Sequence, residues 1–336
     1  MTNIRAVSKL AGVSVATVSR ALQKPDMVSD ATREKVKKAV EEAGYKPNMM
    51  ARNFRSKKSF SIMVLVPDVS NPFFGRVISA IQHEARARKH NVILGNTMGK
   101  IDLERELAHL LLTNQTDGII QLSSRYPLSD EDRAAAKSQP IVNCCECVDD
   151  DSMPTIQLDN SGAAKAMTEH LLELGHKRIG VIAGPEASPL TTARLEGHMA
   201  ALKAHRISAD QSLIMAGDYS LASGKAAAES LLALTTRPCA IFCCNDEMAI
   251  GALHAIREAG LKVPEDISVT GFDDLEFASY TSPALTTVAQ PSAAFGAHAI
   301  STLFDIMAGL KTQERHLVLP YELIIRGSTG PAPRPN

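Results

Sequence analysis

Polar side chains that can bind a ligand follow most of the apolar runs in this sequence after residue 60. Carboxylates, amides and hydroxyls stand where a run of Val, Ile and Leu ends. In open sheets of parallel strands, ligands bind beyond the carboxyl ends of the strands. Each such residue can also cap a helix, but together they favour a hydrogen-bonding pocket for a hydroxyl-rich ligand. The set comprises Asp68, Ser123, Ser124, Asp159, Asp218, Asn245, Asp246, Asp273 and Asp274.

Cysteines offer a second kind of chemistry, because Cys144 and Cys147 form a C-x-x-C pair. A zinc site needs a second pair or suitably spaced histidines, and none follows. The run that holds Cys144 and Cys145 is apolar, and a reduced thiol there packs as a small hydrophobic side chain. We therefore expect no metal and no cofactor.

The elements that position these residues begin at Ser61, where apolar runs alternate with stretches of helical periodicity. Strands that are apolar throughout are buried on both faces, so the alternation indicates a parallel sheet covered by helices. We predict strands at 62–66, 92–94, 118–122, 141–142 and 155–158, helices near 74–89 and 102–115, and an exposed connection at 127–139.

A second set of runs has the same character. We predict strands at 179–183, 213–215, 240–242, 267–271 and 286–289, with helices near 192–205, 221–234 and 247–259. A helix at 293–307 and a strand at 321–325 close this part of the chain. Two similar sheets imply an α/β body of two doubly wound lobes with a cleft between them.

The first 45 residues have a small, all-helical pattern. Apolar spacing predicts a helix over 4–11, Gly12 a turn, Ser14 the cap of a second helix, and residues 30–43 a third helix. Three short helices with one exposed, capped N-terminus make a helix-turn-helix domain. We expect Ile4, Val7, Leu10, Ala11, Val18, Ala21 and Leu22 to face inward, and Val15, Ala16, Thr17, Ser19 and Arg20 to lie on other faces.

Charge separates this head from the body. Residues 1–60 hold 13 Lys and Arg against 5 Asp and Glu, a net +8, which leaves 23 against 32, a net −9, for the remainder. A basic head on an acidic body is typical of a module that binds a polyanion, attached to a part with another task. No apolar run approaches the ~20 residues that span a bilayer, and no secretory signal precedes the first helix. We therefore expect a cytoplasmic protein.

Three segments of the head carry a more specific pattern: Ser8 to Arg20 (S-K-L-A-G-V-S-V-A-T-V-S-R), Val28 to Val36, and Gly44 to Asn48 (G-Y-K-P-N). This pattern resembles the DNA-binding head of the LacI/GalR repressor family, although the family usually has an acid at the position of Ala6. The resemblance implies that small apolar side chains contact bases, that an arginine reaches a guanine or a phosphate, and that hydroxyls bond phosphates. The residues so implied are Ser14, Val15, Ala16, Thr17, Ser19, Arg20, Ser29 and Thr32.

Residues 46–60 are short and basic, and an isolated helix of this length is marginal in water. By the same resemblance, this linker folds into a hinge helix only on DNA, with Asn48, Ala51 and Arg52 as further DNA contacts. Phe54 stands at the position of an apolar wedge that enters the minor groove. The alternative is that Phe54 anchors a core.

Several runs of the body, such as Ala183-Gly-Pro-Glu, Leu261-Lys-Val-Pro-Glu-Asp and Glu322-Leu-Ile-Ile-Arg-Gly, resemble the nucleoside-responding branch of that family. The resemblance implies a fold like that of periplasmic binding proteins, with crossings between the lobes near Asp159, near Gln290 and before Tyr321. It also implies that acids, amides and an arginine grip sugar hydroxyls while aromatic rings stack a base. Cys145 stands where many members have Asp or Asn. The ligand-binding residues implied are Phe73, Phe74, Ser124, Cys145, Asp159, Arg194, Tyr219, Asn245, Asp273 and Gln290.

We therefore predict a helix-turn-helix head at 1–45, a linker at 46–60 and a two-lobed ligand-binding body at 61–330. The function predicted is that of a repressor that binds double-stranded operator DNA and answers to a nucleoside such as cytidine, with no membrane partner. The Pro-rich end, with Pro331, Pro333 and Pro335, cannot form a helix for tetramers, so we expect a homodimer.

Other functions remain open from the sequence. A purine or a sugar is an alternative effector within the same family. An enzyme is a different class, for which Asp246, Asp273 and Asp274 could supply paired carboxylates, but the usual phosphate-binding and nucleophile motifs are absent from the sequence. A transport binding protein would match the body alone.

Overall fold

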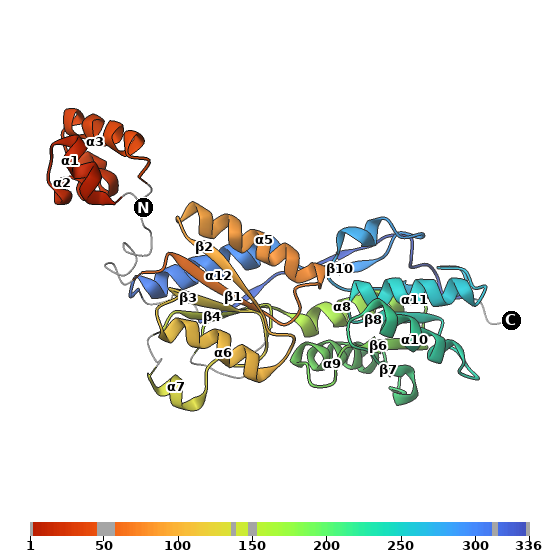
Figure 1. Ribbon diagram of the computed structural model, residues 1–336. Helices are drawn as coiled ribbons and strands as arrows, with labels where there is room; N and C mark the ends of the chain where they lie inside the picture. Colours follow the sequence, from red (N-terminus) through yellow and green to blue (C-terminus); the bar gives the residue numbers. More distant parts are fainter. Residues whose placement is uncertain (1–2, 46–57, 136–138, 147–152, 311–314, 334–336) are drawn as a thin grey trace. The chain divides into compact units, whose positions relative to one another are not determined.

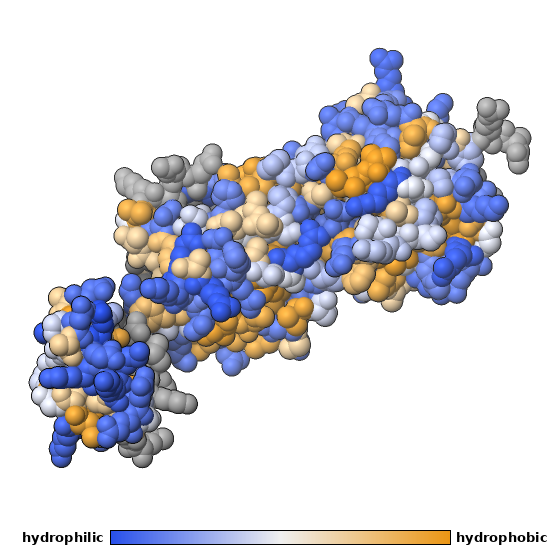
Figure 2. All heavy atoms as spheres, turned by 90° about the horizontal axis from the view of Figure 1, so that it is seen from above, coloured by the Kyte–Doolittle hydropathy of each residue, from blue (hydrophilic) through white to orange (hydrophobic). Residues whose placement is uncertain are grey.

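The computed structural model describes residues 3–45, 58–135, 139–146, 153–310 and 315–333. They form two compact units, Met1–Ser59 and Phe60–Asn336, which we call the head and the body (Figure 1). Most of the predicted linker, residues 46–57, lies outside the described residues. On the face shown in Figure 2, hydrophilic side chains cover most of the head, whereas apolar side chains gather in several patches on the body.

Three helices build the head, each begun by a side-chain cap. Asn3 Oδ1 accepts from Ala6 N at 3.1 Å, Ser14 Oγ from Thr17 N at 3.1 Å, and Ser29 Oγ from Thr32 N at 3.4 Å. Gly12 ends the first helix with φ +63°, a conformation that a side chain would strain. The elements are α1 (Ile4–Ala11), α2 (Val15–Gln23), the 3-10 helix η1 (Pro25–Met27) and α3 (Asp30–Glu42).

The core of the head is smaller than predicted. Val7, Val18, Ala21, Val36 and Ala39 are buried together. Leu10 and Leu22, expected to face inward, are 51% and 36% exposed. Leu22 follows buried Ala21 and is turned about 100° from it around the helix, which takes it off the buried stripe.

The first lobe of the body, the N-lobe, is a sheet of six parallel strands in the order β11-β5-β4-β3-β1-β2. Along β1, Ile62, Val64 and Val66 pack on one face while Met63 and Leu65 pack on the other, as the two-residue period of a strand requires. Helices α5 and α12 cover the first face and α6 the second (Figure 1). The elements are β1 (Ser61–Val66), α5 (Pro72–Ala87), β2 (Asn91–Asn96), α6 (Ile101–Leu112), β3 (Gly118–Gln121), α7 (Asp130–Ala135), β4 (Ile141–Cys144), β5 (Thr155–Leu158), α12 (Ser292–Met307) and β11 (His316–Leu319).

The second lobe, the C-lobe, has four parallel strands in the order β7-β6-β8-β9. Helix α8 packs against α9, and α10 against α11. The doubly wound architecture predicted for both lobes is confirmed. The elements are α8 (Asn160–Glu173), β6 (Ile179–Ala183), α9 (Pro189–Ala204), η2 (Gln211–Leu213), β7 (Ile214–Ala216), α10 (Leu221–Leu232), β8 (Ala240–Cys243), α11 (Asp246–Glu258), β9 (Ser268–Thr270) and η3 (Glu276–Ser279).

The chain crosses between the lobes at the three predicted places. It leaves the N-lobe after β5, returns after β10 (Thr287–Ala289) to form α12, and leaves again between β11 and β12 (Glu322–Ile324). Strands β10 and β12 pair antiparallel, so two of the crossings lie side by side.

Among the α-helices and strands, three differ from prediction. Helix α8 was not predicted, because its apolar residues are mostly Ala and Gly, which give a weak periodic signal. Strand β11 was missed as well. Residues 127–139, expected to be a connection, contain the short helix α7, which Ser129 caps by accepting from Asp132 N at 3.1 Å.

The close packing of α10 on α11 depends on a glycine. A Cβ on Gly224 would lie 2.2 Å from the Met248 carbonyl oxygen and 2.4 Å from its Cα, distances that no side chain tolerates. The helices therefore meet backbone against backbone at this point, which holds α11 and the residues before it in place.

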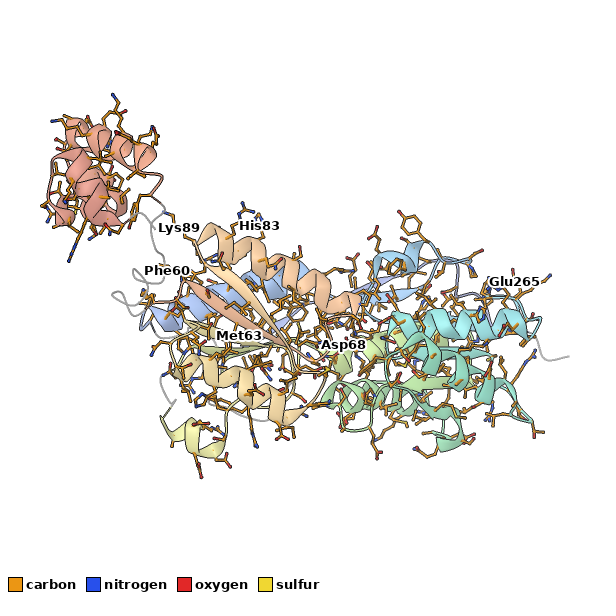
Figure 3. All side chains as sticks on the ribbon, in the orientation of Figure 1. Phe60, Met63, Asp68, His83, Lys89 and Glu265 are labelled. Atoms are coloured by element: carbon orange, nitrogen blue, oxygen red, sulfur yellow. The ribbon has the colours of Figure 1, made fainter. Side chains whose placement is uncertain are left out.

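The chain enters the body at Phe60, whose backbone N–H donates to Asp117 Oδ2 at 2.8 Å. Asp68 lies just beyond the other end of β1. Figure 3 shows these two residues at opposite ends of the N-lobe sheet. Within the residues that the structure describes, no helix is both long and apolar enough to cross a membrane.

Candidate functional site

A cavity of about 450 Å³ lies between the two lobes, at the carboxyl ends of their strands. This volume is within the range of small-molecule sites. The cavity is lined from the N-lobe, the C-lobe and the second crossing. Nine of the ten residues predicted to bind a ligand line it: Phe73, Phe74, Ser124, Cys145, Arg194, Tyr219, Asn245, Asp273 and Gln290.

The tenth, Asp159, is not part of the cavity lining. Its exposed carboxylate caps α8, with Oδ1 accepting from Gly162 N at 2.8 Å. The neighbouring Asn160 points to the site instead, because its Oδ1 accepts from Arg194 Nε at 3.0 Å. The pattern of polar residues at the ends of strands, the strand-end pattern, therefore marked this turn of the chain, where Asn160, and not Asp159, contacts a side chain of the cavity lining.

Arg194 is the buried cation of the cavity. Besides its bond to Asn160, it donates from Nη1 to the Cys244 carbonyl oxygen. Its guanidinium carbon stands 3.7 Å from the centre of the Phe272 ring, a cation–π contact. Three fixed contacts hold the remaining donors of this side chain toward the cavity, where they can bond an acceptor on a ligand.

Asp273 is the acid placed opposite Arg194. Its Oδ1 accepts from Gln290 Nε2 at 2.6 Å, and its backbone N–H donates to the Val288 carbonyl oxygen at 2.8 Å. Burial raises the pKa of Asp273 to about 6, although Arg194 and the Gln290 bond oppose the rise. The carboxylate is therefore tied to the second crossing by Gln290, just as Arg194 is tied to the first by Asn160.

The other two acids considered for paired chemistry have structural partners. Asp246 Oδ1 accepts from Thr287 Oγ1 at 2.6 Å and its Oδ2 from Leu275 N at 2.7 Å. Asp274 Oδ1 bonds Arg326 at 2.7 Å. Both carboxylates thereby fasten the loop after β9 rather than face a ligand.

Aromatic rings border the cavity from both lobes. Phe73 and Phe74 have centroids 5.5 Å apart, and Phe73 meets Phe295 edge to face at 6.4 Å. Tyr219 comes from the C-lobe, where its hydroxyl lies 2.9 Å from Thr191 Oγ1 and burial raises its pKa. These rings are held by packing, so they present fixed faces and edges to a flat ligand.

Asn245 and the thiols complete the predicted set. Asn245 caps α11 through a 2.9 Å bond from Met248 N, and its Nδ2 donates to the Tyr219 carbonyl oxygen at 2.9 Å. The sulfur atoms of Cys144 and Cys145 are 3.6 Å apart, and burial raises the pKa of Cys145, which keeps this thiol protonated. Cys147 lies outside the described residues. Among the described residues, no three His, Cys, Asp or Glu side chains gather as a metal site.

Three charged residues of the lining were not predicted: Arg125, Glu146 and Glu247. Burial raises the pKa of Glu146 to about 7, against the opposing effect of Arg194 and Arg125. Glu146 follows β4 by two residues, so the strand-end pattern could have identified it. In the sequence, the cysteines that precede it indicate thiol or metal chemistry more strongly than ligand binding by the acid.

On the head, the start of α2 is open to solvent. Val15 is 39% exposed, Ala16 and Arg20 are exposed, and Thr17 and Ser19 are half-buried. Ser14 and Thr17 share a side-chain hydrogen bond of 2.9 Å, as do Ser29 and Thr32. The predicted contacts Asn48, Ala51, Arg52 and Phe54 lie outside the described residues.

Comparison with known proteins gives consistent results for both units. Residues 3–48 match the model of bacterial regulatory proteins of the lacI family, and residues 168–329 match a periplasmic binding protein-like domain. The chain is 41% identical over 327 residues to the HTH-type transcriptional repressor CytR of Escherichia coli (strain K12), covering 97% of this chain and 96% of the relative.

Two further matches extend over nearly the whole chain. Catabolite control protein A of Priestia megaterium is 34% identical over 324 residues, 96% of this chain and 98% of the relative. Among solved structures, the lac repressor dimer bound to operator and the anti-inducer ONPF superposes with a TM-score of 0.87 at 31% identity, covering 98% of this chain and 99% of that one.

Proposed function

This chain belongs to the lacI family of bacterial regulatory proteins, and from that premise we propose that it is a transcriptional repressor whose operator binding is controlled by a nucleoside in the interlobe cavity. The observation that carries the proposal is the cavity itself. It combines buried polar groups suited to sugar hydroxyls with aromatic rings suited to a base.

The head would bind the major groove through the exposed start of α2. Val15 and Ala16 would pack on thymine methyl groups, and Arg20 would bond a guanine. Ser14, Thr17, Ser19, Ser29 and Thr32 would position the head on phosphates. Since the similar lac repressor is bound to its operator as a dimer, we propose a homodimer that places two heads on a partly palindromic operator.

The linker would carry the rest of the DNA contact. We propose that residues 46–60 form a hinge between the head (1–45) and the body (61–330), and that Asn48, Ala51, Arg52 and Phe54 contact DNA. Phe54 would enter the central minor groove as a wedge and unstack a base step. A Phe54→Ala variant would then lose operator affinity and keep its affinity for the effector.

Control of DNA binding would arise from closure of the cleft. Arg194 and Asp273 are each bonded to a residue at a crossing. A ligand that binds both side chains would therefore change the geometry of those crossings. The lobes would then shift at the dimer interface and separate the paired hinges. The effector must bind the DNA-free state more tightly than the DNA-bound state. The free energy of operator binding that is lost equals the difference between the effector's binding free energies for these two states.

We propose that the cavity binds its ligand without turning it over. Asp246 and Asp274 are engaged by structural partners, and the buried thiols have raised pKa values. A repressor acts where the chromosome is, so the cytoplasm is its proposed location. A purine or a sugar is the alternative effector.

The experiment is a gel-shift titration of the full-length protein on genomic fragments that it selects. Cytidine should release the DNA at lower concentration than purine bases, purine nucleosides or sugars. Asp273→Ala should bind operator normally and lose the response. If only a purine or a sugar releases the DNA, that compound and not a nucleoside is the effector. If Asp273→Ala still responds to the nucleoside, the cavity is not the effector site.

A further inference from the structure

Two buried polar atoms of the cavity wall have no hydrogen-bond partner within the described part of the chain: Glu146 Oε2 and Arg125 Nε. Both side chains line the interlobe cavity. Buried polar atoms are rarely left unpaired, because burial removes the water that would otherwise bond them. A ligand in the cavity can supply both missing partners.

These two side chains form one edge of the cavity. Arg125 follows β3 and Glu146 follows β4, which are neighbouring parallel strands. Arg125 lies near enough to stabilise the ionised form of Glu146. Asn143 Nδ2 donates to the Ser123 carbonyl oxygen at 2.7 Å, so the two strand ends are joined directly beneath them.

Arg125 is also fixed from the other side. Its Nη2 donates to the Gly99 carbonyl oxygen at 3.1 Å and lies 3.8 Å from the buried Glu104 Oε2. The same Glu104 oxygen accepts from Ser123 Oγ at 2.8 Å. The Nε–H of Arg125 is therefore a donor of fixed position beside a carboxyl group.

The hydrogen-bonding character of this edge selects among bases. Cytosine presents an amino donor, a ring-nitrogen acceptor and a carbonyl acceptor in a row, whereas uracil has a carbonyl in place of the amino group. Glu146 can accept from the amino group, and Arg125 Nε–H can donate to the carbonyl oxygen. Burial raises the pKa of Glu146 to about 7, so near neutral pH the carboxyl also carries a proton that it can donate to the ring nitrogen.

We propose that Glu146, assisted by Arg125, recognises the base of the effector, and that this base is an aminopyrimidine of the cytosine type. The inference rests on the nucleoside-controlled function proposed above and adds the residue that sets its specificity. The charged and titratable groups that act on Glu146 are Arg125 and Arg194, and Cys145 lies beside it. The sugar of the nucleoside then lies toward Arg194, Asp273 and Asn245.

The test is calorimetric titration of the full-length protein at pH 7 with cytidine and with uridine. The native protein should bind cytidine at least about tenfold more tightly, because a site built around a hydrogen bond rejects the analogue that lacks the group. Glu146→Ala should lose about ten- to a hundredfold in cytidine affinity and little in uridine affinity. In Glu146→Gln the amide oxygen can still accept from the amino group of cytosine, and the amide NH2 can donate to the ring nitrogen. This variant should therefore stay within about threefold of the native cytidine affinity.

The matched control is Glu186→Ala, which removes an exposed acid beside the lining residues Pro185 and Ala187 and should leave both affinities unchanged. Unaltered operator binding in the gel shift shows that the variants are folded. As a test that needs no variant, N4,N4-dimethylcytidine lacks the amino hydrogens and should bind the native protein at least about tenfold more weakly than cytidine.

The possible failures are distinguishable. A Glu146→Ala variant with the native cytidine-to-uridine ratio, or equal affinity for cytidine and its dimethyl analogue, overturns this inference and leaves the proposed nucleoside function standing. A native protein that binds neither nucleoside overturns both.

Discussion

Arg194 Nε donates to Asn160 Oδ1 at 3.0 Å, so the buried cation of the cavity is held by the second residue after β5, at the first crossing between the lobes. The bond joins α9 to the start of α8 within the C-lobe. It connects a cation of the cavity lining to the chain beside a crossing.

Asn160→Ala should weaken effector binding about tenfold, because an Arg donor loses its buried partner, a loss of about 1–3 kcal/mol. Isothermal titration with the effector measures the change. Asp159→Ser is the matched control, because serine keeps the cap of α8 and Asp159 lies outside the cavity lining. Equal losses in the two variants would show that the effect comes from α8 in general.

Glu146→Gln should make the stability of the ligand-free protein less dependent on pH. Burial raises the pKa of Glu146 from 4.5 to about 7, so the folded state holds the proton more tightly than the unfolded state. The stability this contributes is complete below pH 4.5 and lost as pH rises through 7. Since the side chain is partly open to the cavity, we expect about 1–2 kcal/mol.

Urea unfolding at pH 5 and pH 8 measures that contribution. The native protein should lose more free energy of unfolding between the two pH values than Glu146→Gln does, while Asp273, with a pKa raised to about 6, contributes equally to both. Glu186→Gln, an exposed acid, should follow the native protein. Parallel curves for all three would contradict the raised pKa.

Gly224→Ala should destabilise the body by about 1–3 kcal/mol, because the new methyl group would strike the backbone of Met248 where α10 crosses α11. Thermal unfolding of the full chain detects the change. Gly75 provides the control: it is an exposed helical glycine of α5 whose Cβ would meet no heavy atom within 4 Å. Gly75→Ala should leave stability unchanged or raise it by up to about 1 kcal/mol.

Arg20→Ala should lower operator affinity by about 1–3 kcal/mol and relax the preference at one base pair. Lys9→Ala removes the same charge from the exposed face of α1 and should weaken specific and non-specific DNA binding alike. Binding to the operator and to scrambled DNA, compared at one salt concentration, separates the two effects. An unchanged specificity ratio in Arg20→Ala would remove this side chain from base recognition.

The strand-end pattern was informative because it follows from the geometry of parallel sheets. Ser124, Asn245 and Asp273 all line the cavity for this reason, while their contact with an effector stays a prediction. Asp159 shows the limit, since a residue at a crossing turns with the chain, and only the fold decides which neighbour faces the site. The position of a residue at the end of a strand predicts at which edge of the sheet it lies. It does not predict where the side chain of that residue points.

Other features had no local signal in the sequence. The unpaired atoms of Glu146 and Arg125 depend on what surrounds them, and burial is a property of the folded chain. Helix α8 packs against α9 and buries Ala163, Ala164 and Met167, but its small residues give little contrast between its faces. The exposure of Leu10 and Leu22 likewise depends on how few partners a three-helix core offers.

Strand β1 (Ser61–Val66) separates Phe60, where the chain enters the body, from Asp68 at the cavity, and its six residues span about 20 Å. The end bonded to Asp117 is where the chain enters the body, and the other end borders the cavity. Because a buried strand of this length lies between them, a side chain substituted at one end makes no direct contact with the other end. A repressor built on this plan can acquire a new signal without changing the genes it controls, or new genes without changing its signal.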